Sequence, residues 1–244
     1  MMRSLTLDAK TKGFSAKKAQ EKKYARKLKK VAQQVGDITE SYRDGSYLND
    51  GYEEAMAFYT QGLFPWAQKV AREMVTSVDL SNISAWAAMS KKLGASMRKD
   101  PVLPKVMSLM DEQVELILSL PTVAAQRAQK LSLEAALDGA RADEIAKEIA
   151  RTGEVTSSRA VLIARTEVAR ASSQLTEARA VSVGSEAYIW RTSEDSDVRE
   201  SHKEMDGKVC YWASPPTLSD GTTTNAGGIY NCRCYPEPIF SDAV

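Results

Sequence analysis

Apolar residues recur every three or four positions through most of residues 15–183, which is the spacing of one buried face of an α-helix. Ser15 is a suitable N-cap for the first helix, and Gly36 is expected to end it just after residue 34. Pro65 predicts a kink or a break, and Pro121 predicts the first turn of a new helix. The pattern predicts helices over about 15–34, 52–78, from Ser81 or Ser84 to Asp100, 103–119, 121–137, 141–151 and 156–183.

The pattern changes after Gly184, where aromatic and β-branched residues replace the helical spacing. Residues 187–192 and 208–212 are typical of strands, and residues 197–205 of a short helix between them. Residues 213–230 are rich in Pro, Gly and Thr, and predict a loop so long that something must pin it. No sheet is needed before residue 185.

These elements predict a mainly α N-terminal region with a small α+β C-terminal domain. We expect three parts: a disordered basic arm over residues 1–14, a helical region over 15–155, and the α+β domain over 156–244. The long helix that begins near residue 156 would run into the terminal domain and give it a rigid handle.

Charge is distributed unevenly along the chain, although the net charge is only +1. In residues 1–30 basic residues far outnumber Asp8 and Glu21, whereas acidic residues outnumber basic ones from residue 186 onward. The first helix has few large apolar residues, so we expect it to lie against a partner. DNA phosphates or an acidic protein surface would suit it, and a merely solvated surface is the simpler alternative. The residues proposed for this contact are Lys17, Lys18, Lys22, Lys23, Arg26, Lys27, Lys29 and Lys30.

The composition is that of a soluble globular protein, with 43% hydrophobic and 27% charged residues. We expect no membrane span, because no apolar stretch approaches the roughly 18 residues that a span requires. The lysine-rich beginning lacks the apolar segment of a secretory signal. The three cysteines are therefore expected in a reducing cytoplasm, without disulfides.

An ordered set of short motifs lies between residues 156 and 240. The set comprises Arg165, Thr166 and Glu167 on the long helix, then Trp190, Asp197, Arg199, His202, Asp206 and Gly207, and finally Asn231, Cys232, Arg233 and Cys234. In this order the motifs resemble the Mu F-like family of phage head morphogenesis proteins, which are minor head proteins. One departure is that Gly228-Ile229-Tyr230 stands where many members have Pro-His or Pro-Gly. A metal ligand from that histidine is therefore absent.

The resemblance implies a structural protein, not an enzyme, that acts in capsid assembly at the portal and in DNA packaging or delivery. It implies the portal protein as a partner, with the major capsid protein or a scaffold protein as further candidates, and the basic charge of residues 1–30 adds DNA as a candidate partner. It places the chain in the interior of the phage head, and in the host cytoplasm during assembly. The alternative is a sequence-independent DNA-binding scaffold module.

The single histidine and all three cysteines lie close together in the sequence, between residues 202 and 234. His202, Cys210, Cys232 and Cys234 form a Cys3His set that suits a structural zinc ion, and such an ion would pin the long loop. Two observations favour a metal-free knot of hydrogen bonds instead. The spacing is not that of a standard zinc finger, and Cys210 would also suit a small buried apolar position.

Two further roles are open for these motif residues. Cys232 or Cys234 would serve a Cys/His hydrolase or toxin-like enzyme as nucleophile, with His202 as base and Asp197 or Asp206 orienting it. Arg165 is expected to pair with one of the same two aspartates, while Glu167 would meet Arg170 one helical turn away. Asp206-Gly207 is typical of a tight turn, and Trp190 and Trp212 are expected in the core.

Overall fold

The computed structural model describes residues 12–42, 50–93, 102–137 and 142–240. Its N-terminal part is mostly helical, and a small three-stranded antiparallel sheet lies near the C-terminus, which confirms the predicted fold class. After a 3-10 helix η1 (Lys12–Phe14), the long helices are α1 (Lys18–Glu40), α2 (Asp50–Leu93), α3 (Leu103–Leu137), α4 (Ala142–Ala150) and α5 (Thr152–Ser182). None of the described helices is long and apolar enough to cross a membrane.

Two prolines do not interrupt the helices as the sequence predicts. Pro65 lies inside α2 and Pro121 inside α3. Of the kink or break predicted at Pro65, the break does not occur, and the new helix predicted at Pro121 is wrong. Each proline removes one backbone hydrogen bond. Buried residues continue on both sides of each one, with Leu63 and Ala67 around Pro65. Continuous burial of one helical face outweighs the lost bond.

Contacts divide the chain into two compact units. The first contains residues 1–21, 73–109 and 165–244, and the second contains residues 22–72 and 110–164. Both units therefore combine segments from before and after residue 155, the boundary expected from the sequence. Each unit is described below by itself.

The second unit has an apolar core built from neighbouring helices. Its buried cluster contains Val35, Tyr52, Met56, Ala124, Ala128 and Ile149. Gly36, expected to end the first helix, lies inside α1 because that helix packs closely against α5. A Cβ atom added to Gly153 would lie 2.8 Å from the Gly36 Cα atom, so only glycine fits the crossing.

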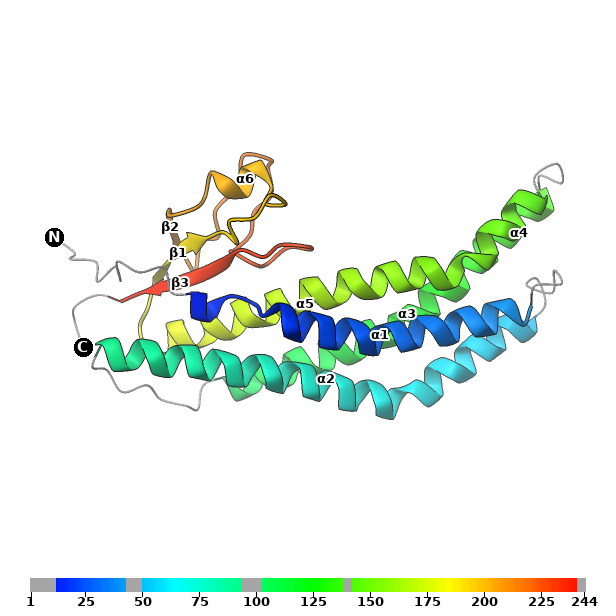
Figure 1. Cartoon of the computed structure of the whole chain (residues 1–244), viewed down its shortest axis with the longest axis horizontal. Coiled ribbons are helices and arrows are strands. Elements are labelled where there is room, and N and C mark those ends of the chain that lie inside the picture. Colours follow the sequence, from blue (N-terminus) through cyan, green and yellow to red (C-terminus); the bar gives the residue numbers. More distant parts are fainter. Residues whose placement is uncertain (1–11, 43–49, 94–101, 138–141, 241–244) are drawn as a thin grey trace. The chain divides into compact units, whose positions relative to one another are not determined.

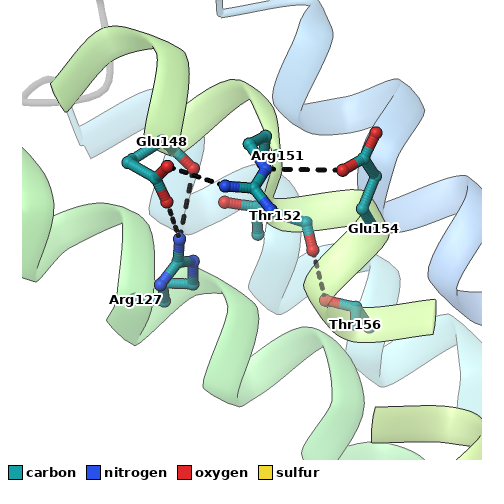
Figure 2. A network of polar contacts seen from close by, with 6 residues as sticks. All are labelled: Arg127, Glu148, Arg151, Thr152, Glu154 and Thr156. Carbon is teal, nitrogen blue, oxygen red and sulfur yellow. Dashed lines mark hydrogen bonds and ion pairs between the residues drawn. The ribbon is translucent and has the colours of Figure 1, made fainter. Parts of the chain in front are cut away.

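The junction of α4 and α5 in this unit carries a network of polar contacts (Figure 2). Arg127 Nη2 donates to the Glu148 carboxylate at 3.1 Å and to its backbone oxygen at 3.3 Å. Arg151 Nη1 donates to the same carboxylate at 2.8 Å, and the Thr156 hydroxyl donates to the Thr152 carbonyl at 2.7 Å. The ion pairs are half-exposed, so they orient the helix junction more than they stabilise it.

The first unit contains the sheet, in the strand order β2-β1-β3. The strands are β1 (Ala187–Arg191), β2 (Val209–Tyr211) and β3 (Tyr235–Ile239), and the short helix α6 (Glu200–Lys203) follows β1 (Figure 1). The core of this unit includes Tyr188, Trp190 and Trp212, which confirms the prediction for both tryptophans. The sequence did not predict β3.

Part of the predicted N-terminal arm belongs to this core. Residues 1–11 lie outside the described residues, but Lys12–Phe14 are helical and Phe14 is fully buried. Its ring meets Trp86 edge-on with centroids 5.2 Å apart, and its backbone oxygen accepts from the Ser172 hydroxyl at 2.9 Å. The assignment of residues 12–14 to a disordered arm is therefore corrected, because one apolar residue anchors them.

Candidate metal centre

The single histidine is held in the interior of the first unit. His202 lies on α6, is 2% exposed, and meets the Trp190 ring edge-on with centroids 5.5 Å apart. Trp190 is on β1 and is fully buried, so strand and helix together fix the imidazole. Its Nε2 atom is buried and has no hydrogen-bond partner among the described residues.

Cys232 and Cys234 lie just before β3 and are both buried free thiols. Asn231 precedes them with φ of 55°, a left-handed conformation that asparagine tolerates better than most residues. The backbone N–H of Cys234 donates to Cys232 Sγ at 3.4 Å. This turn directs both sulfur atoms toward His202.

The three side chains form one cluster. His202 Nδ1 lies 3.4 Å from Cys232 Sγ and 3.4 Å from Cys234 Sγ. All three donor atoms lie within 4.8 Å of one another, and all three residues are buried. Histidine nitrogen and cysteine sulfur are the preferred ligands of zinc, so the cluster is a possible metal site.

The two thiols differ in their electrostatics. Hydrogen bonding from Cys234, followed by that from His202, lowers the pKa of Cys232 to about 4 against the opposing effect of burial. Hydrogen bonding to Cys232 raises the pKa of Cys234, and burial raises it further. The hydrogen bond between the two sulfur atoms thus moves the pKa values of the two thiols in opposite directions.

Cys210 is not part of this cluster, which corrects the predicted four-residue set. It lies on β2 directly opposite Tyr188 of β1, and its sulfur contacts the Lys208 backbone oxygen at 3.9 Å. Burial raises the pKa of its thiol. The pairing of β2 with β1 thus places the Cys210 side chain in the core around Tyr188.

Arg165 also has a different partner from the one expected. Its Nη1 donates to Asn231 Oδ1 at 2.7 Å, and the Asn231 backbone N–H donates to Thr166 Oγ1 at 2.9 Å. The expected pairing of Arg165 with Asp197 or Asp206 is therefore wrong. Two adjacent residues of α5 instead hold the turn that carries the cysteines.

Asp197 and Asp206, the two aspartates expected beside Arg165 or His202, have other partners. Arg233 donates to Asp195 at 2.7 Å and to Asp197 at 3.1 Å. Asp206 accepts from the backbone N–H of Thr192 at 2.8 Å, and Gly207 follows with φ of 82°, which confirms the tight turn. Neither aspartate is positioned as the orienting acid of a catalytic histidine.

The remaining motif residues also make structural contacts. Arg199 donates to the Tyr230 backbone oxygen at 3.2 Å and lies over the Tyr230 ring, 5.0 Å from its centroid. Glu167 accepts from Arg170 at 2.7 Å, as its spacing predicted. Both thiols and the imidazole are only 2–4% exposed, so the pair proposed for the hydrolase alternative is buried.

Several contacts that hold the long loop were not found from the sequence. Ser173 on α5 donates to the Ala226 backbone oxygen at 2.5 Å, and the Tyr188 hydroxyl donates to Asn225 at 2.9 Å. Gly227 passes so close to Cys234 that an added Cβ would lie 2.8 Å from its backbone oxygen. Only the glycine pair at 227–228 signalled this close approach.

The basic residues proposed for DNA or protein contact lie elsewhere, on and just before α1. Leu28, Val31 and Val35 form the buried face of this helix. Of the seven proposed residues from Lys18 to Lys30, six are exposed on α1 and Lys27 is partly buried, and Lys17 is exposed just before the helix. The exposed ones are Lys17, Lys18, Lys22, Lys23, Arg26, Lys29 and Lys30.

The fold and this site define a helical protein whose C-terminal α+β region is tied to a long helix around a buried His–Cys–Cys cluster. Residues 126–236 match the family described as Phage Mu protein F like protein. This match confirms the resemblance predicted from the motifs. The match begins at residue 126, before the first motif recognised in the sequence.

One relative extends the comparison beyond this segment. It is a protein of Haemophilus influenzae named "Uncharacterized protein", 31% identical over 182 residues that cover 72% of this chain. The chain spans only 40% of the length of that relative. No solved structure matches the chain.

Proposed function

We propose that this chain is a minor head protein that acts in capsid assembly inside the phage head and associates there with the portal protein. The family match over residues 126–236 carries this proposal. The site supports it, because Arg165, Thr166 and Asn231 bind one another and thereby fix the fold. Motif residues whose contacts with one another hold the fold together suit a structural protein of the head.

The test uses heads and head precursors of the phage that encodes the chain. We expect the tagged full chain to co-purify with the portal protein from both, with the major capsid protein or a scaffold protein as a weaker partner. Heads assembled without it should contain less DNA or deliver it less efficiently, measured as DNA per particle and infectivity. Absence of the chain from heads and precursors alike would contradict the proposal.

The exposed basic face of α1 supports a DNA contact as part of the same role. Lys22 and Lys29 are exposed on this face, one position off the buried Leu28 or further, and can approach phosphates from the side facing solvent. Because such contacts release counterions, the affinity for DNA should fall steeply with salt and be independent of sequence. The same surface would serve the second candidate function, a DNA-binding scaffold module without a portal contact.

Charge-reversed variants test the DNA contact without removing the buried face of the helix. Lys22→Glu with Lys29→Glu should lower the affinity for duplex DNA and make the log–log salt slope shallower by about two. Lys130→Ala, whose side chain is 80% exposed on α3, is the matched control and should leave both unchanged. Normal DNA binding by the reversed variant would contradict the DNA contact and leave an acidic protein surface or solvent at this face. DNA binding without portal co-purification would favour the scaffold alternative.

We also propose that zinc is the metal of the His202–Cys232–Cys234 cluster and that its role is structural. An ion there would join α6 to the segment before β3 and so fasten the far end of the loop over residues 213–230. The full chain purified from zinc-supplemented cells should carry one zinc ion, measured by elemental analysis. A strong chelator should lower its melting temperature. Metal-free protein with the same melting temperature would contradict this part.

A further inference from the structure

The cluster supplies three ligand atoms, whereas zinc in proteins is almost always four-coordinate in structural sites. We infer that His202, Cys232 and Cys234 hold zinc as its only protein ligands, and that an exchangeable water molecule completes the tetrahedron. This inference rests on the proposal that the cluster binds zinc. It adds the coordination of the ion and a ligand class: small monodentate anions that can replace the water.

The distances within the cluster suit a tetrahedral ion. Zinc bonds of about 2.0–2.1 Å to nitrogen and about 2.3 Å to sulfur place N and S about 3.6 Å apart at a tetrahedral angle. The corresponding separations from His202 Nδ1 to the two sulfur atoms are 3.4 Å each. Only a small outward movement of the side chains would admit the ion.

The equal distances also argue against hydrogen bonding as the sole reason for the arrangement. His202 Nδ1 offers either one proton or one lone pair, and so makes one good hydrogen bond at a time. It nevertheless lies equally close to two sulfur atoms, which is what a shared central ion requires. The N–H of Cys234 that points at Cys232 Sγ would stabilise the thiolate ligand.

No fourth histidine, cysteine or carboxylate joins the group within the part of the chain that the structure describes. Cys210 contacts Lys208 and lies opposite Tyr188. Asp197, which lines the cavity beside the cluster, accepts from Arg233 and is largely exposed. We therefore assign the fourth position to a ligand from solvent.

A small cavity beside the cluster has room for that ligand. It is lined by both cysteines and His202, together with Ser193, Asp197, Val198, Arg199, Asn231 and Arg233. The space open to the centre of a water molecule is about 10 Å³, close to what one water needs. Ser193 lines this cavity, and its Oγ atom is buried and has no hydrogen-bond partner among the described residues. A zinc-bound water would give this hydroxyl its partner.

This coordination differs in kind from a closed four-residue site. Three protein ligands and one water leave a position at which another ligand can enter as the water leaves. The small volume of the cavity restricts entry to ligands of a few atoms. Arg233 on its lining is already matched by Asp195 and Asp197, so Arg199 supplies the positive charge that favours an anion. Azide is a suitable probe of both properties.

The experiment uses the full chain loaded with zinc for X-ray absorption and with cobalt(II) for visible spectra. We expect two sulfur and two nitrogen or oxygen neighbours around zinc, and a cobalt spectrum that azide changes in a saturable way. Cys210→Ser should leave both results unchanged, whereas Cys232→Ser should remove one sulfur neighbour or abolish binding. Ser193→Ala should retain the metal and alter the azide titration.

The outcomes distinguish failure of the three-ligand coordination from failure of the zinc proposal itself. Three sulfur neighbours, or loss of one in Cys210→Ser, would overturn the inference while leaving the zinc proposal intact. A cobalt spectrum insensitive to azide would also overturn it, as would loss of metal in Asp197→Asn, which would identify that carboxylate as the fourth ligand. A full chain that binds neither metal would overturn the zinc proposal and this inference together.

Discussion

The second unit and the C-terminal part of the first unit are stabilised by different kinds of interaction. In the second unit, helices meet through apolar side chains and through one close glycine crossing at Gly36 and Gly153. In the C-terminal part, strands of three to five residues support a loop held by individual donors such as Ser173 and Thr166. Apolar burial spreads the stabilising free energy over many atoms, whereas a hydrogen bond that joins two segments concentrates it in one contact. Substitutions should therefore act through volume in the first case and through lost donors, acceptors or metal in the second.

The largest effect is expected where burial alone supports the structure. Ile117→Ala on α3 removes a fully buried side chain from the second unit and should cost about 2–5 kcal/mol of unfolding free energy, because it leaves a cavity. Leu133→Ala on the same helix, where the side chain is 54% exposed, is the control and should stay within about 0.5 kcal/mol. Urea unfolding followed by circular dichroism measures both. Equal effects would contradict an apolar origin of stability here.

The glycine crossing tests volume in the opposite direction. Gly153→Ala puts a methyl group 2.8 Å from the Gly36 Cα atom, so the helices must separate, at a cost of about 1–3 kcal/mol. Gly62→Ala is the matched control, because an added Cβ meets nothing within 4 Å and alanine favours the helix by about 1 kcal/mol. Melting temperatures should thus move in opposite directions. A stabilised Gly153→Ala would show that the helices are not in close contact.

The same contrast explains which elements could be predicted from the sequence. Helical periodicity located the long helices because their buried faces repeat regularly. It failed at Gly36, at Pro65 and Pro121, and between residues 78 and 81, where α2 continues, because tertiary burial there outweighs a local rule. β3 was missed because Pro236 and Pro238 argue against a strand. They are tolerated because β3 is an edge strand and both prolines occupy alternate positions, whose missing N–H groups face the same way.

The sequence predicted most residues of the candidate site but few of their contacts. The histidine and the Cys-x-Cys pair were found because they are rare residue types gathered in a short segment. Cys210 was included for the same reason, but strand pairing, which sequence proximity does not encode, places it opposite Tyr188. Charge complementarity likewise suggested an aspartate for Arg165, whereas the partner is the amide oxygen of Asn231.

The tie between α5 and the cysteine turn should show a smaller effect that depends on chemistry instead of volume. Asn231→Ala removes the oxygen that accepts from Arg165 and places alanine at a positive φ, which together should cost about 1–2 kcal/mol. Asn231→Gly loses the same oxygen but relieves the backbone, so it should be the milder change. If both variants also lower zinc affinity, the turn positions the ligands. Identical stabilities for Asn231→Ala and the unchanged chain would contradict the tie.

The smallest effect is expected at the polar network of the helix junction in Figure 2. Hydrogen bonding to Arg151 lowers the pKa of Glu148, so the contribution of the pair is present near neutral pH and is lost as pH falls through the lowered pKa. Solvent screens both groups, however, and Arg127 continues to hold the carboxylate when Arg151 is absent. Arg151→Gln should therefore leave the urea midpoint unchanged at neutral pH and at high salt. A clear loss at low salt that disappears at high salt would show that this exposed pair contributes more than screening allows, and that polar ties matter in the helical unit as well.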